Sequence, residues 1–443
     1  MRLEVWLGDV LIGWLSHEPA SHRFALDYAP EWLADPRRFP LSPRLPLLAG
    51  SGVSAEAHSA EVRLFFDNLL PEGRALDEAA AAHGVARSNL VGLLLALGRE
   101  TAGALRVGLP GALTLDDQPA SRRALRRDEL SARIRARPEW PFSVWDGRVR
   151  LSIAGYQDKL AAYVEGEDWF LVEGADLAST HIFKPEPTTA ALAGLTSNEF
   201  FCMRLARAVN LAVAEVDLLH VPEPVLRIAR FDRVIADGKV LRHHVIDGCQ
   251  ALGLPAAYKY ERPYGNQADV RGIRDGASLR GVFALASLGP TPAALRLALL
   301  RWVLFQVLIG NTDAHAKNLS FFWGPEGLTL APAYDLVCGS AYSGEALDQS
   351  YALAIGDAFA AEELTPYEWA VFAQSCGFPA RLLQQELIGM AKRLLAVLPV
   401  TRAEVTEADA EPAMLAKIEA SLRQECARQS EMAAGIVAAA RMV

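Results

Sequence analysis

One loop and the segment that follows it constrain this chain more than any other part. The loop lies in Ile309-Gly-Asn-Thr-Asp-Ala-His-Ala-Lys-Asn-Leu-Ser, where Asp313 is followed by Asn318 five residues later, and Asp335 comes seventeen residues after Asn318. Phosphoryl transfer from a magnesium nucleotide requires an acid, an amide and a second acid in this order. The first carboxylate orients the attacking hydroxyl, while the other two groups hold the metal that bridges the phosphates.

The local pattern predicts how these groups meet. Residues 293–309 place apolar side chains at every third or fourth position, which predicts a helix, and Gly310 is a helix stop. Residues 319–330 predict two short strands around a Gly-Pro-Glu-Gly turn. Such a hairpin would bring Asp335 back beside Asn318, where two oxygen ligands could share one Mg²⁺. In protein kinases the base and the metal-binding Asn have the same five-residue spacing.

Two other interpretations of this loop stay open. Asp313 and Asn318 could be ordinary loop residues that bond to the backbone, as Asp and Asn side chains often do. His315 beside Asp313 could belong to a transition-metal site. However, no second His or Cys cluster follows at ligand spacing, so the metal-hydrolase interpretation is weak.

Length and composition set the broad class. The chain has 443 residues, of which 51% are hydrophobic and 22% charged, so it can form two or three domains with large cores. A net charge of -9 argues against a free-standing nucleic-acid binder. The most apolar run, 294–310, is interrupted by Arg296, Arg301 and Gln306 and reads as a buried helix, not a membrane span. Five scattered cysteines and an N-terminus without a signal-peptide pattern favour the cytoplasm.

A glycine-containing turn lies between two apolar segments in Ser152-Ile-Ala-Gly-Tyr-Gln-Asp-Lys159. Backbone N–H groups of such a turn can lie over phosphate oxygens. Because it has one glycine and not Gly-x-Gly-x-x-Gly, an ordinary hairpin turn stays an alternative.

Two charged residues follow at the positions that a kinase needs. Lys184 ends a predicted strand at 180–184, where kinases place the lysine that contacts the α and β phosphates, although any single Lys can be a surface residue. Glu199 opens a predicted helix. It could close a Thr-x-x-Glu capping box that begins at Thr196, or it could be the partner that orients Lys184. The sequence does not separate these two roles.

The order of elements predicts the fold class. Strands at 213–221 and 225–231 are followed from residue 270 by mostly helical segments. In a kinase-like order, main-chain groups near Ala229, Arg230 and Phe231 would read adenine. We therefore expect an α+β chain with a two-lobed protein-kinase-like fold, an additional N-terminal α+β subdomain and an all-helical C-terminal lobe. The expected boundaries are 1–110 for the N-terminal subdomain, 111–147 for a linker, 148–235 for the nucleotide-binding part and 236–443 for the helical lobe.

These motifs together resemble the HipA family of serine/threonine-protein kinase toxins from bacterial toxin–antitoxin pairs. The resemblance covers nearly the whole chain, and the motif at 310–318 is its most specific part. The residues that carry it are Ser152 to Lys159, His181-Ile-Phe-Lys184-Pro, Asn198-Glu199-Phe-Phe-Cys, Arg230-Phe-Asp-Arg233, Asp247-Gly-Cys-Gln250, Gly310 to Asn318, Leu330-Ala-Pro-Ala-Tyr-Asp335 and, near the N-terminus, Tyr28-Ala-Pro-Glu-Trp-Leu33 and Phe65-Phe-Asp-Asn-Leu-Leu-Pro71.

The resemblance implies a role for each site position. Asp313 would be the catalytic base, Asn318 and Asp335 the Mg²⁺ ligands, and Glu199 the residue that orients Lys184. The remaining positions would bind ATP, and they are Ala154, Gly155, Tyr156, Gln157, Asp158, Lys159 and Lys184 toward the phosphates, Ala229, Arg230 and Phe231 at the adenine, and His315, Ala316, Lys317 and Tyr334 beside the metal ligands.

The resemblance also implies partners and regulation. Ser152 matches a serine that family members phosphorylate in their own phosphate loop, and a dianion there would exclude the nucleotide phosphates. The substrate class in the family is an aminoacyl-tRNA synthetase, so translation would be inhibited and growth arrested, the state linked to persistence. The expected partner is a small HipB-like, helix-turn-helix antitoxin dimer, which would supply most contacts to operator DNA. No membrane is implied.

Three positions depart from the family pattern, and two other functions stay open. Leu160 stands where a Thr is common, Ala229 where an acidic residue is frequent, and Val245-Ile246 precede Asp247 instead of Gln-Glu. A small-molecule phosphotransferase of the aminoglycoside-kinase kind also has Asp-x4-Asn, but the N-terminal subdomain would then be unexplained. A non-catalytic co-repressor would have no need of the intact Asp313 and Lys184.

Overall fold

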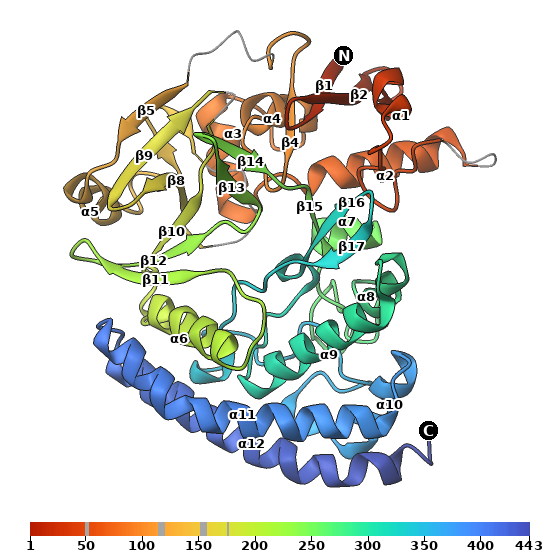
Figure 1. Cartoon of the computed structure of the whole chain (residues 1–443), viewed down its shortest axis with the longest axis vertical. Helices are drawn as coiled ribbons and strands as arrows, with labels where there is room; N and C mark the ends of the chain where they lie inside the picture. Colours follow the sequence, from red (N-terminus) through yellow and green to blue (C-terminus); the bar gives the residue numbers. More distant parts are fainter. Residues whose placement is uncertain (49–52, 114–119, 151–156, 175–176) are drawn as a thin grey trace. The chain divides into compact units, whose positions relative to one another are not determined.

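The computed structural model describes residues 1–48, 53–113, 120–150, 157–174 and 177–443 (Figure 1). The chain divides into two compact units, which are described separately. The first unit comprises Met1–Pro185, His220–Ala256 and Phe322–Gly327, and the second comprises Glu186–Leu219, Ala257–Phe321 and Leu328–Val443. Both units contain helices and strands, as expected for an α+β chain.

The strands are β1 (Arg2–Leu7), β2 (Val10–Glu18), β3 (Arg23–Tyr28), β4 (Leu105–Gly108), β5 (Ser121–Ala124), β6 (Val144–Trp145), β7 (Arg148–Val149), β8 (Leu160–Glu165), β9 (Asp168–Glu173), β10 (His181–Pro185), β11 (Val216–His220), β12 (Pro224–Ala229), β13 (Arg233–Ala236), β14 (Lys239–Arg242), β15 (Val245–Asp247), β16 (Ser320–Gly324) and β17 (Gly327–Leu330). The helices are α1 (Pro30–Ala34), α2 (Ala55–Asp67), α3 (Gly73–His83), α4 (Leu90–Leu97), α5 (Arg127–Arg135), α6 (Leu195–Ala208), α7 (Gly248–Leu252), α8 (Leu279–Ala284), α9 (Pro292–Leu308), α10 (Pro366–Ser375), α11 (Ala380–Glu407) and α12 (Pro412–Ala439).

The first unit begins with an antiparallel sheet of strand order β3-β2-β1-β4. Leu3 and Val5 alternate with more exposed residues and point into the core, which is the period-two pattern of a half-buried strand. Helix α2 packs on β3, where the hydroxyl of Ser59 accepts a hydrogen bond of 2.9 Å from the backbone N–H of Phe24. Residues 1–110 therefore contain both strands and helices, as expected for an N-terminal α+β subdomain.

A second sheet in the same unit has the neighbour order β12-β10-β8-β9-β5. All its pairs are antiparallel, and Lys184 of β10 lies opposite Leu226 of β12. Segment 111–147, which we expected to be a linker, contributes β5 to this sheet and contains α5. In β5, Arg122 stacks on the ring of Tyr163, at 4.6 Å from its centroid, so a cation–π contact accompanies the strand pairing.

His244, next to β15, is buried in the first unit and gives it a dependence on pH. Its Nε2 atom lies 2.8 Å from the carbonyl oxygen of Leu41, so Nε2 carries a hydrogen and donates it to this oxygen. Burial lowers the pKa of His244 from 6.5 to about 4, although the bond to Leu41 acts in the opposite direction. Between these two pH values the unfolded chain binds a proton that the folded chain does not, so this group weakens the fold as the pH falls.

We therefore expect His244→Gln to lose less stability on acidification than the wild type. The difference between pH 7 and pH 5 should shrink by about 2 kcal/mol, the amount set by one group with these two pKa values. Urea unfolding at both pH values measures it, with the exposed His220→Gln as the control. An unchanged difference in His244→Gln would show that His244 is not the group that titrates.

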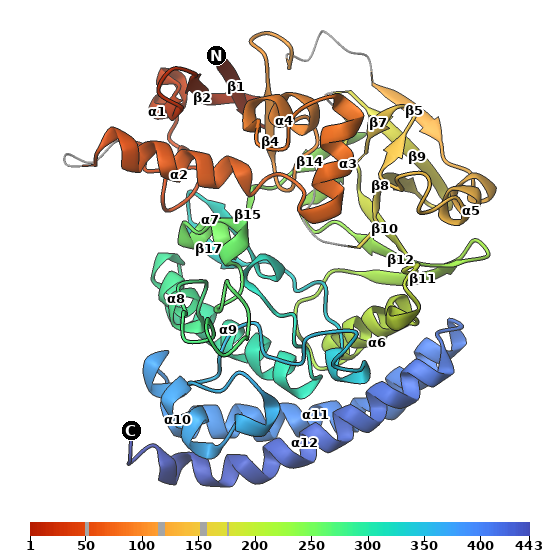
Figure 2. The same cartoon turned by 180° about the vertical axis from the view of Figure 1, so that it is seen from behind.

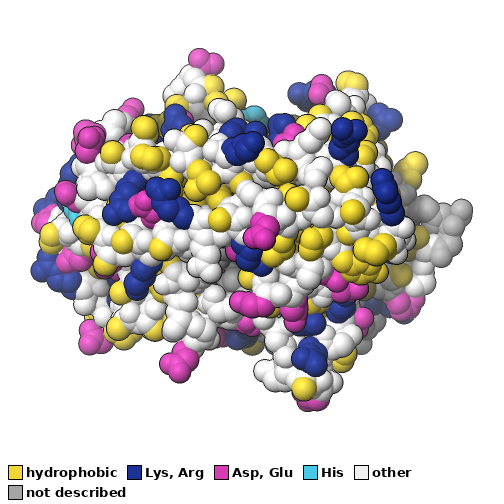
Figure 3. All heavy atoms as spheres, turned by 90° about the horizontal axis from the view of Figure 1, so that it is seen from below, with side chains coloured by type: hydrophobic (Ala, Val, Ile, Leu, Met, Phe, Trp, Pro, Cys, Tyr) yellow, Lys and Arg dark blue, Asp and Glu magenta, His cyan; other side chains and the backbone are white. Residues whose placement is uncertain are grey.

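The second unit is built on long helices, and both views show α11 and α12 running side by side, with α6 and α9 next to them (Figures 1 and 2). Helix α10 is capped by the hydroxyl of Thr365 and fixed by a 2.8 Å hydrogen bond from Trp369 Nε1 to Gln429 Oε1 of α12. Helices α10, α11 and α12 agree with the mostly helical segments expected after residue 270, and α11 continues through Pro399 to Glu407. Figure 3 looks onto the α11–α12 end and shows acidic and basic side chains mixed among apolar ones, as on a solvated helical surface.

One detail of the expected organisation is wrong, and one of the two alternatives for Glu199 is not observed. Residues 236–443 are not all helical, because they contain strands β14 to β17. The Thr196-to-Glu199 capping box is absent, since the cap position of α6 is Gly194. The carboxylate of Glu186 satisfies this helix end instead, accepting from the backbone N–H groups of Leu195 and Thr196 at 3.1 Å and from the Thr196 hydroxyl. A carboxylate there also complements the helix dipole.

Candidate active site

The loop after α9 starts at Gly310, which has φ +67°. A Cβ at this position would lie 2.2 Å from the hydroxyl of Ser340, so both the backbone conformation and the space require glycine. Asn311 is buried and anchored, since its side-chain amide donates to Gln306 Oε1 at 2.8 Å. The expected helix stop at Gly310 is confirmed, and its backbone conformation sets the direction of the following loop.

Asp313 is the exposed residue of a largely buried loop. Its backbone N–H donates to Asn311 Oδ1 at 3.0 Å, and its carbonyl accepts from the His315 N–H at 2.8 Å. The hydroxyl of Tyr260 donates to Asp313 Oδ1 at 2.6 Å. The carboxylate is therefore held in place while it stays accessible, as a catalytic base must be.

Asn318 lies at the end of the same loop and is 9% exposed. Its Nδ2 atom donates to the carbonyl of Asp313 at 2.9 Å. This bond sets the orientation of the amide, because the nitrogen faces Asp313 and the oxygen Oδ1 must face the other way. Oδ1 is a hard oxygen ligand of the kind that Mg²⁺ prefers.

Asp335 follows the β16–β17 hairpin, which closes with a 3.0 Å bond from the Ala331 N–H to the Ser320 carbonyl. It has φ +57°, a left-handed backbone that Asp tolerates better than most residues and that recurs at functional positions. The neighbouring Tyr334 donates from its hydroxyl to the Lys317 carbonyl at 2.7 Å. The hairpin therefore ties the Asp335 segment to the Asn318 end of the loop, as predicted.

The charged groups around His315 set the electrostatics of the site residues that lie in the second unit. His315 is buried, and this burial, followed by the positive charge of Lys259, lowers its pKa to about 3. Lys317 lowers it further and Asp335 raises it, so all these charges lie near the ring. A neutral imidazole between cations suits a phosphate-binding wall. In the part of the chain that the structure describes, no three His, Cys, Asp or Glu side chains gather where they could hold a metal ion.

Sequence reasoning missed Lys259 and Tyr260. Lys259 is 4% exposed, and its carbonyl accepts from the Ala316 N–H at 3.0 Å. The ring of Tyr260 packs edge-on against His315, with centroids 5.0 Å apart. Both residues lie more than fifty positions before Asp313, in a segment without regular periodicity, so no local pattern pointed to them.

The contact from Tyr260 predicts a catalytic effect. Tyr260→Phe removes the hydrogen bond to Asp313 and should lower kcat about tenfold, the value of one hydrogen bond to a charged group. The KM for ATP should stay unchanged, because Tyr260 positions the base and not the nucleotide. Steady-state kinetics test this, with Tyr264→Phe as the matched control, since that phenol bonds only to the Tyr258 hydroxyl in the described residues. An equal loss in both variants would rule out a positioning role.

The first unit carries the residues expected at the phosphates. Lys184 is 6% exposed on β10. Gln157 Nε2 donates to the Pro185 carbonyl at 3.4 Å, so the end of the turn lies beside Lys184's strand. Asp158 forms an ion pair of 3.0 Å with the buried Arg137, which fixes the turn, and Lys159 is half-buried. Ser152, Ala154, Gly155 and Tyr156 lie outside the described residues.

The segment expected at the adenine is anchored at its centre. Ala229 pairs with His181 in the β10–β12 ladder. The Arg230 N–H donates to the Thr180 carbonyl at 2.8 Å, and its guanidinium is buried among acidic groups. The Phe231 ring packs edge-on against Phe322 at 5.9 Å. Since the Arg230 N–H is already used, main-chain contacts to adenine would have to come from its carbonyl and its neighbours. Glu199 lies in the second unit, 1% exposed on α6.

Comparisons with known proteins cover nearly the whole length of this chain. A family model of the HipA-like C-terminal domain matches residues 151–398, and one of the HipA N-terminal domain matches residues 3–108. The chain is 39% identical over 397 residues to the serine/threonine-protein kinase toxin HipA of Shewanella oneidensis, covering 89% of this chain and 88% of the relative.

A solved structure agrees with the sequence comparison. It is the toxin–antitoxin complex of HipA, HipB and operator DNA from Shewanella oneidensis MR-1, with a TM-score of 0.86 and 38% identity over 98% of this chain and 99% of the matched chain. Across the described residues, every helix is too short or too polar to cross a membrane. With both domains matched in order and nearly the whole length aligned, the chain belongs to the HipA family of serine/threonine-protein kinase toxins.

Proposed function

We propose that this kinase transfers the γ-phosphate of ATP to a serine of a protein substrate, with Asp313 as the base. The observation that best supports this is the Asp313 carboxylate itself, exposed in a buried loop and held by Tyr260. In this arrangement the second carboxylate oxygen can accept the hydrogen bond of a substrate hydroxyl. As the hydroxyl oxygen attacks the γ-phosphorus, the bond from phosphorus to the bridging oxygen breaks, ADP leaves, and the hydroxyl proton passes to Asp313.

The metal site of this proposal consists of Asn318 and Asp335. The fixed amide of Asn318 and the carboxylate of Asp335 are both hard oxygen donors, and the His315 pKa of about 3 keeps its imidazole uncharged. A bound Mg²⁺ would neutralise charge on the transferring phosphate. Lys317 and His315, with Ala316 and Tyr334 beside them, would line the phosphate side.

The nucleotide would be bound by the residues of the first unit. Lys184 and the 154–159 turn, with Gln157, Asp158 and Lys159 at its end, would contact the phosphates, and Ala229 to Phe231 the adenine. Glu199 would orient Lys184. This assigns a two-lobed kinase arrangement to residues 148–235 and 236–443, after an N-terminal subdomain at 1–110 and a connecting segment at 111–147.

The biological role follows from the family. The solved relative assembles with HipB and operator DNA, so we propose a HipB-like helix-turn-helix antitoxin as the partner, with operator DNA contacted mainly through it. The net charge of -9 is consistent with a protein that contacts DNA mainly through its antitoxin. An aminoacyl-tRNA synthetase is the proposed substrate, with translation arrest in the cytoplasm as the outcome. Ser152 is the proposed site of self-phosphorylation.

Intact-mass measurement after incubation with Mg·ATP tests the proposal. The wild type should gain one phosphate, which fragmentation maps to Ser152, and Ser152→Ala should gain none at that position while it still phosphorylates a protein substrate. Omission of Mg²⁺ should prevent the gain. A wild type that binds ATP and gains no phosphate, and whose expression without an antitoxin leaves growth unaffected, would contradict the toxin-kinase function and favour a small-molecule acceptor.

A further inference from the structure

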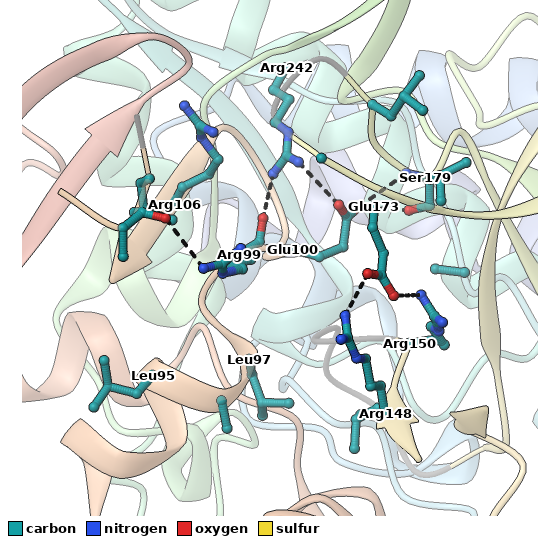
Figure 4. A pocket seen from close by; sticks show the side chains of 18 of the residues that line it. Leu95, Leu97, Arg99, Glu100, Arg106, Arg148, Arg150, Glu173, Ser179 and Arg242 are labelled. Carbon is teal, nitrogen blue, oxygen red and sulfur yellow. Dashed lines mark hydrogen bonds and ion pairs between the residues drawn. The ribbon is translucent and has the colours of Figure 1, made fainter. Parts of the chain in front are cut away.

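A cavity of about 460 Å³ lies in the first unit, apart from the residues assigned to the nucleotide. Its wall comes from α4 and the following loop, β4, β7, β9 and β14, and Figure 4 shows its charged side chains lying around the space. Lys184, Gln157 to Lys159 and Ala229 to Phe231 are not among its described lining residues. Its volume is within the range of sites for small organic ligands, about 300–1,000 Å³.

The described wall of this cavity carries an excess of positive charge. Its acidic residues are Glu100 and Glu173, and its basic residues are Arg99, Arg106, Arg148, Arg150 and Arg242. Glu173 is shared, since it accepts from Arg150 at 2.7 Å and also pairs with Arg148. Two carboxylates against five guanidinium groups leave the described wall with three more positive than negative charges.

Charges behind the wall offset part of this excess, because Arg106 lies 3.6 Å from Asp9 and Arg150 lies 3.4 Å from Asp146. Glu100 contacts Arg242 and Arg230 at 3.1 Å, and Asp232 contacts Arg230 and Arg233 at 2.8 Å. Arg242 and Glu100 are already counted in the wall, so this buried cluster adds two guanidinium groups and one carboxylate, and positive charge still predominates. These positive charges lie close enough to repel one another, because burial and then the charge of Arg230 lower the pKa of Arg233 to about 9. An anion bound in the cavity would reduce this repulsion.

Two nitrogen atoms at the cavity wall have no hydrogen-bond partner among the described residues. The Nε atom of Arg150 is buried and lacks a hydrogen-bond partner among the described residues, as does Nε2 of His83, which also lines the cavity. An unpaired buried guanidinium N–H is costly unless a ligand or water accepts from it. The Arg150 side chain is 11% exposed, whereas that of Arg148 is 61% exposed, so the wall has a buried donor and an accessible one.

The remaining wall is apolar and would contact the part of a ligand that faces away from the arginines. Leu95, Leu97, Leu113, Leu177 and Val172 line it, together with small alanines that leave space. Guanidinium groups match phosphate oxygens in geometry and charge. We propose that this cavity binds a phosphorylated small molecule, with the phosphate at Arg148, Arg150 and Arg242 and an apolar or planar body against the leucines.

Calorimetric titration of the full-length protein with phenyl phosphate tests this site. A non-hydrolysable ATP analogue with Mg²⁺ is present at saturation, so that the nucleotide residues are already occupied. Phenyl phosphate should bind with one-to-one stoichiometry and more tightly than inorganic phosphate, and phenol should not bind. Affinity should fall as the salt concentration rises, because the contacts are ionic.

Variants connect the binding to this cavity. Arg150→Gln should weaken phenyl phosphate about tenfold or more, the effect of losing a charge-assisted hydrogen bond. Ala96→Phe should weaken it by filling the cavity, and Arg135→Gln, an exposed Arg of α5 outside the cavity, should bind as the wild type does. Should Arg150→Gln fail to show cooperative unfolding, the exposed Arg148→Gln replaces it. No saturable binding to the wild type, or wild-type affinity in the arginine variant or in Ala96→Phe, would overturn the proposal.

Discussion

Asp313→Asn is expected to lower kcat for phosphoryl transfer by about a thousandfold, within the range for loss of a general base. The substitution keeps the size of the side chain, and Asn Oδ1 can still accept from Tyr260. It removes the negative charge that would take the substrate proton in the proposed mechanism. Because the proposed metal ligands are Asn318 and Asp335 and not Asp313, binding of Mg·ATP should stay nearly unchanged.

Single-turnover kinetics on a protein substrate and calorimetric titration with Mg·ATP measure the two quantities separately. Asp269→Asn is the control, an exposed acid on a loop of the same unit, and it should retain wild-type values for both. A residual rate in Asp313→Asn above about a tenth of the wild type would be too large for a lost general base and would assign the proton transfer elsewhere.

Asp232→Asn is expected to destabilise the protein by about 3–5 kcal/mol, the usual cost of removing one partner from a buried ion pair. Asp232 is 6% exposed and accepts from Arg230, Arg233 and the Gly103 N–H, all at 2.8 Å. Without its charge, two buried guanidinium groups would be left with Glu100 alone. Cooperative unfolding in urea measures the loss, and the exposed Asp168→Asn should change stability by less than about 0.5 kcal/mol.

The same carboxylate gives the wild type a sensitivity to acid. Burial alone would raise the pKa of Asp232, but the charges of Arg230 and Arg233 outweigh it and hold the pKa far below its ordinary value. The folded state therefore keeps this group ionised where the unfolded state protonates it, so its contribution is present above about pH 4 and is lost as the pH falls further. Asp232→Asn should lack this part of the acid dependence. A variant as stable as the wild type at pH 7, or with the same acid slope, would contradict the role of Asp232.

The conformation of the loop around Asp313 could be predicted from the sequence because its determinants are local. The apolar period of α9, the stop at Gly310 and the turn between β16 and β17 act within a few residues, so the pattern alone predicted the helix, its end and the hairpin that precedes Asp335. The strands that carry Lys184 and Leu226 were predicted for the same reason. What the sequence could not supply were the main-chain partners, such as the bond that occupies the Arg230 N–H.

Contacts between distant segments were decided by the tertiary structure. Tyr260 reaches Asp313, Glu100 reaches Arg230, and Glu186 caps α6 where the pattern had left a Thr196-to-Glu199 capping box open. Such pairs leave no periodic signal, because hydrogen bonds and ion pairs depend on where side chains meet in space. The sequence by itself determined most of the helices and strands, the loop around Asp313 and the family. The folded chain determined which groups hold Asp313 in place and where the excess of guanidinium charge collects, because both result from segments that only folding brings together.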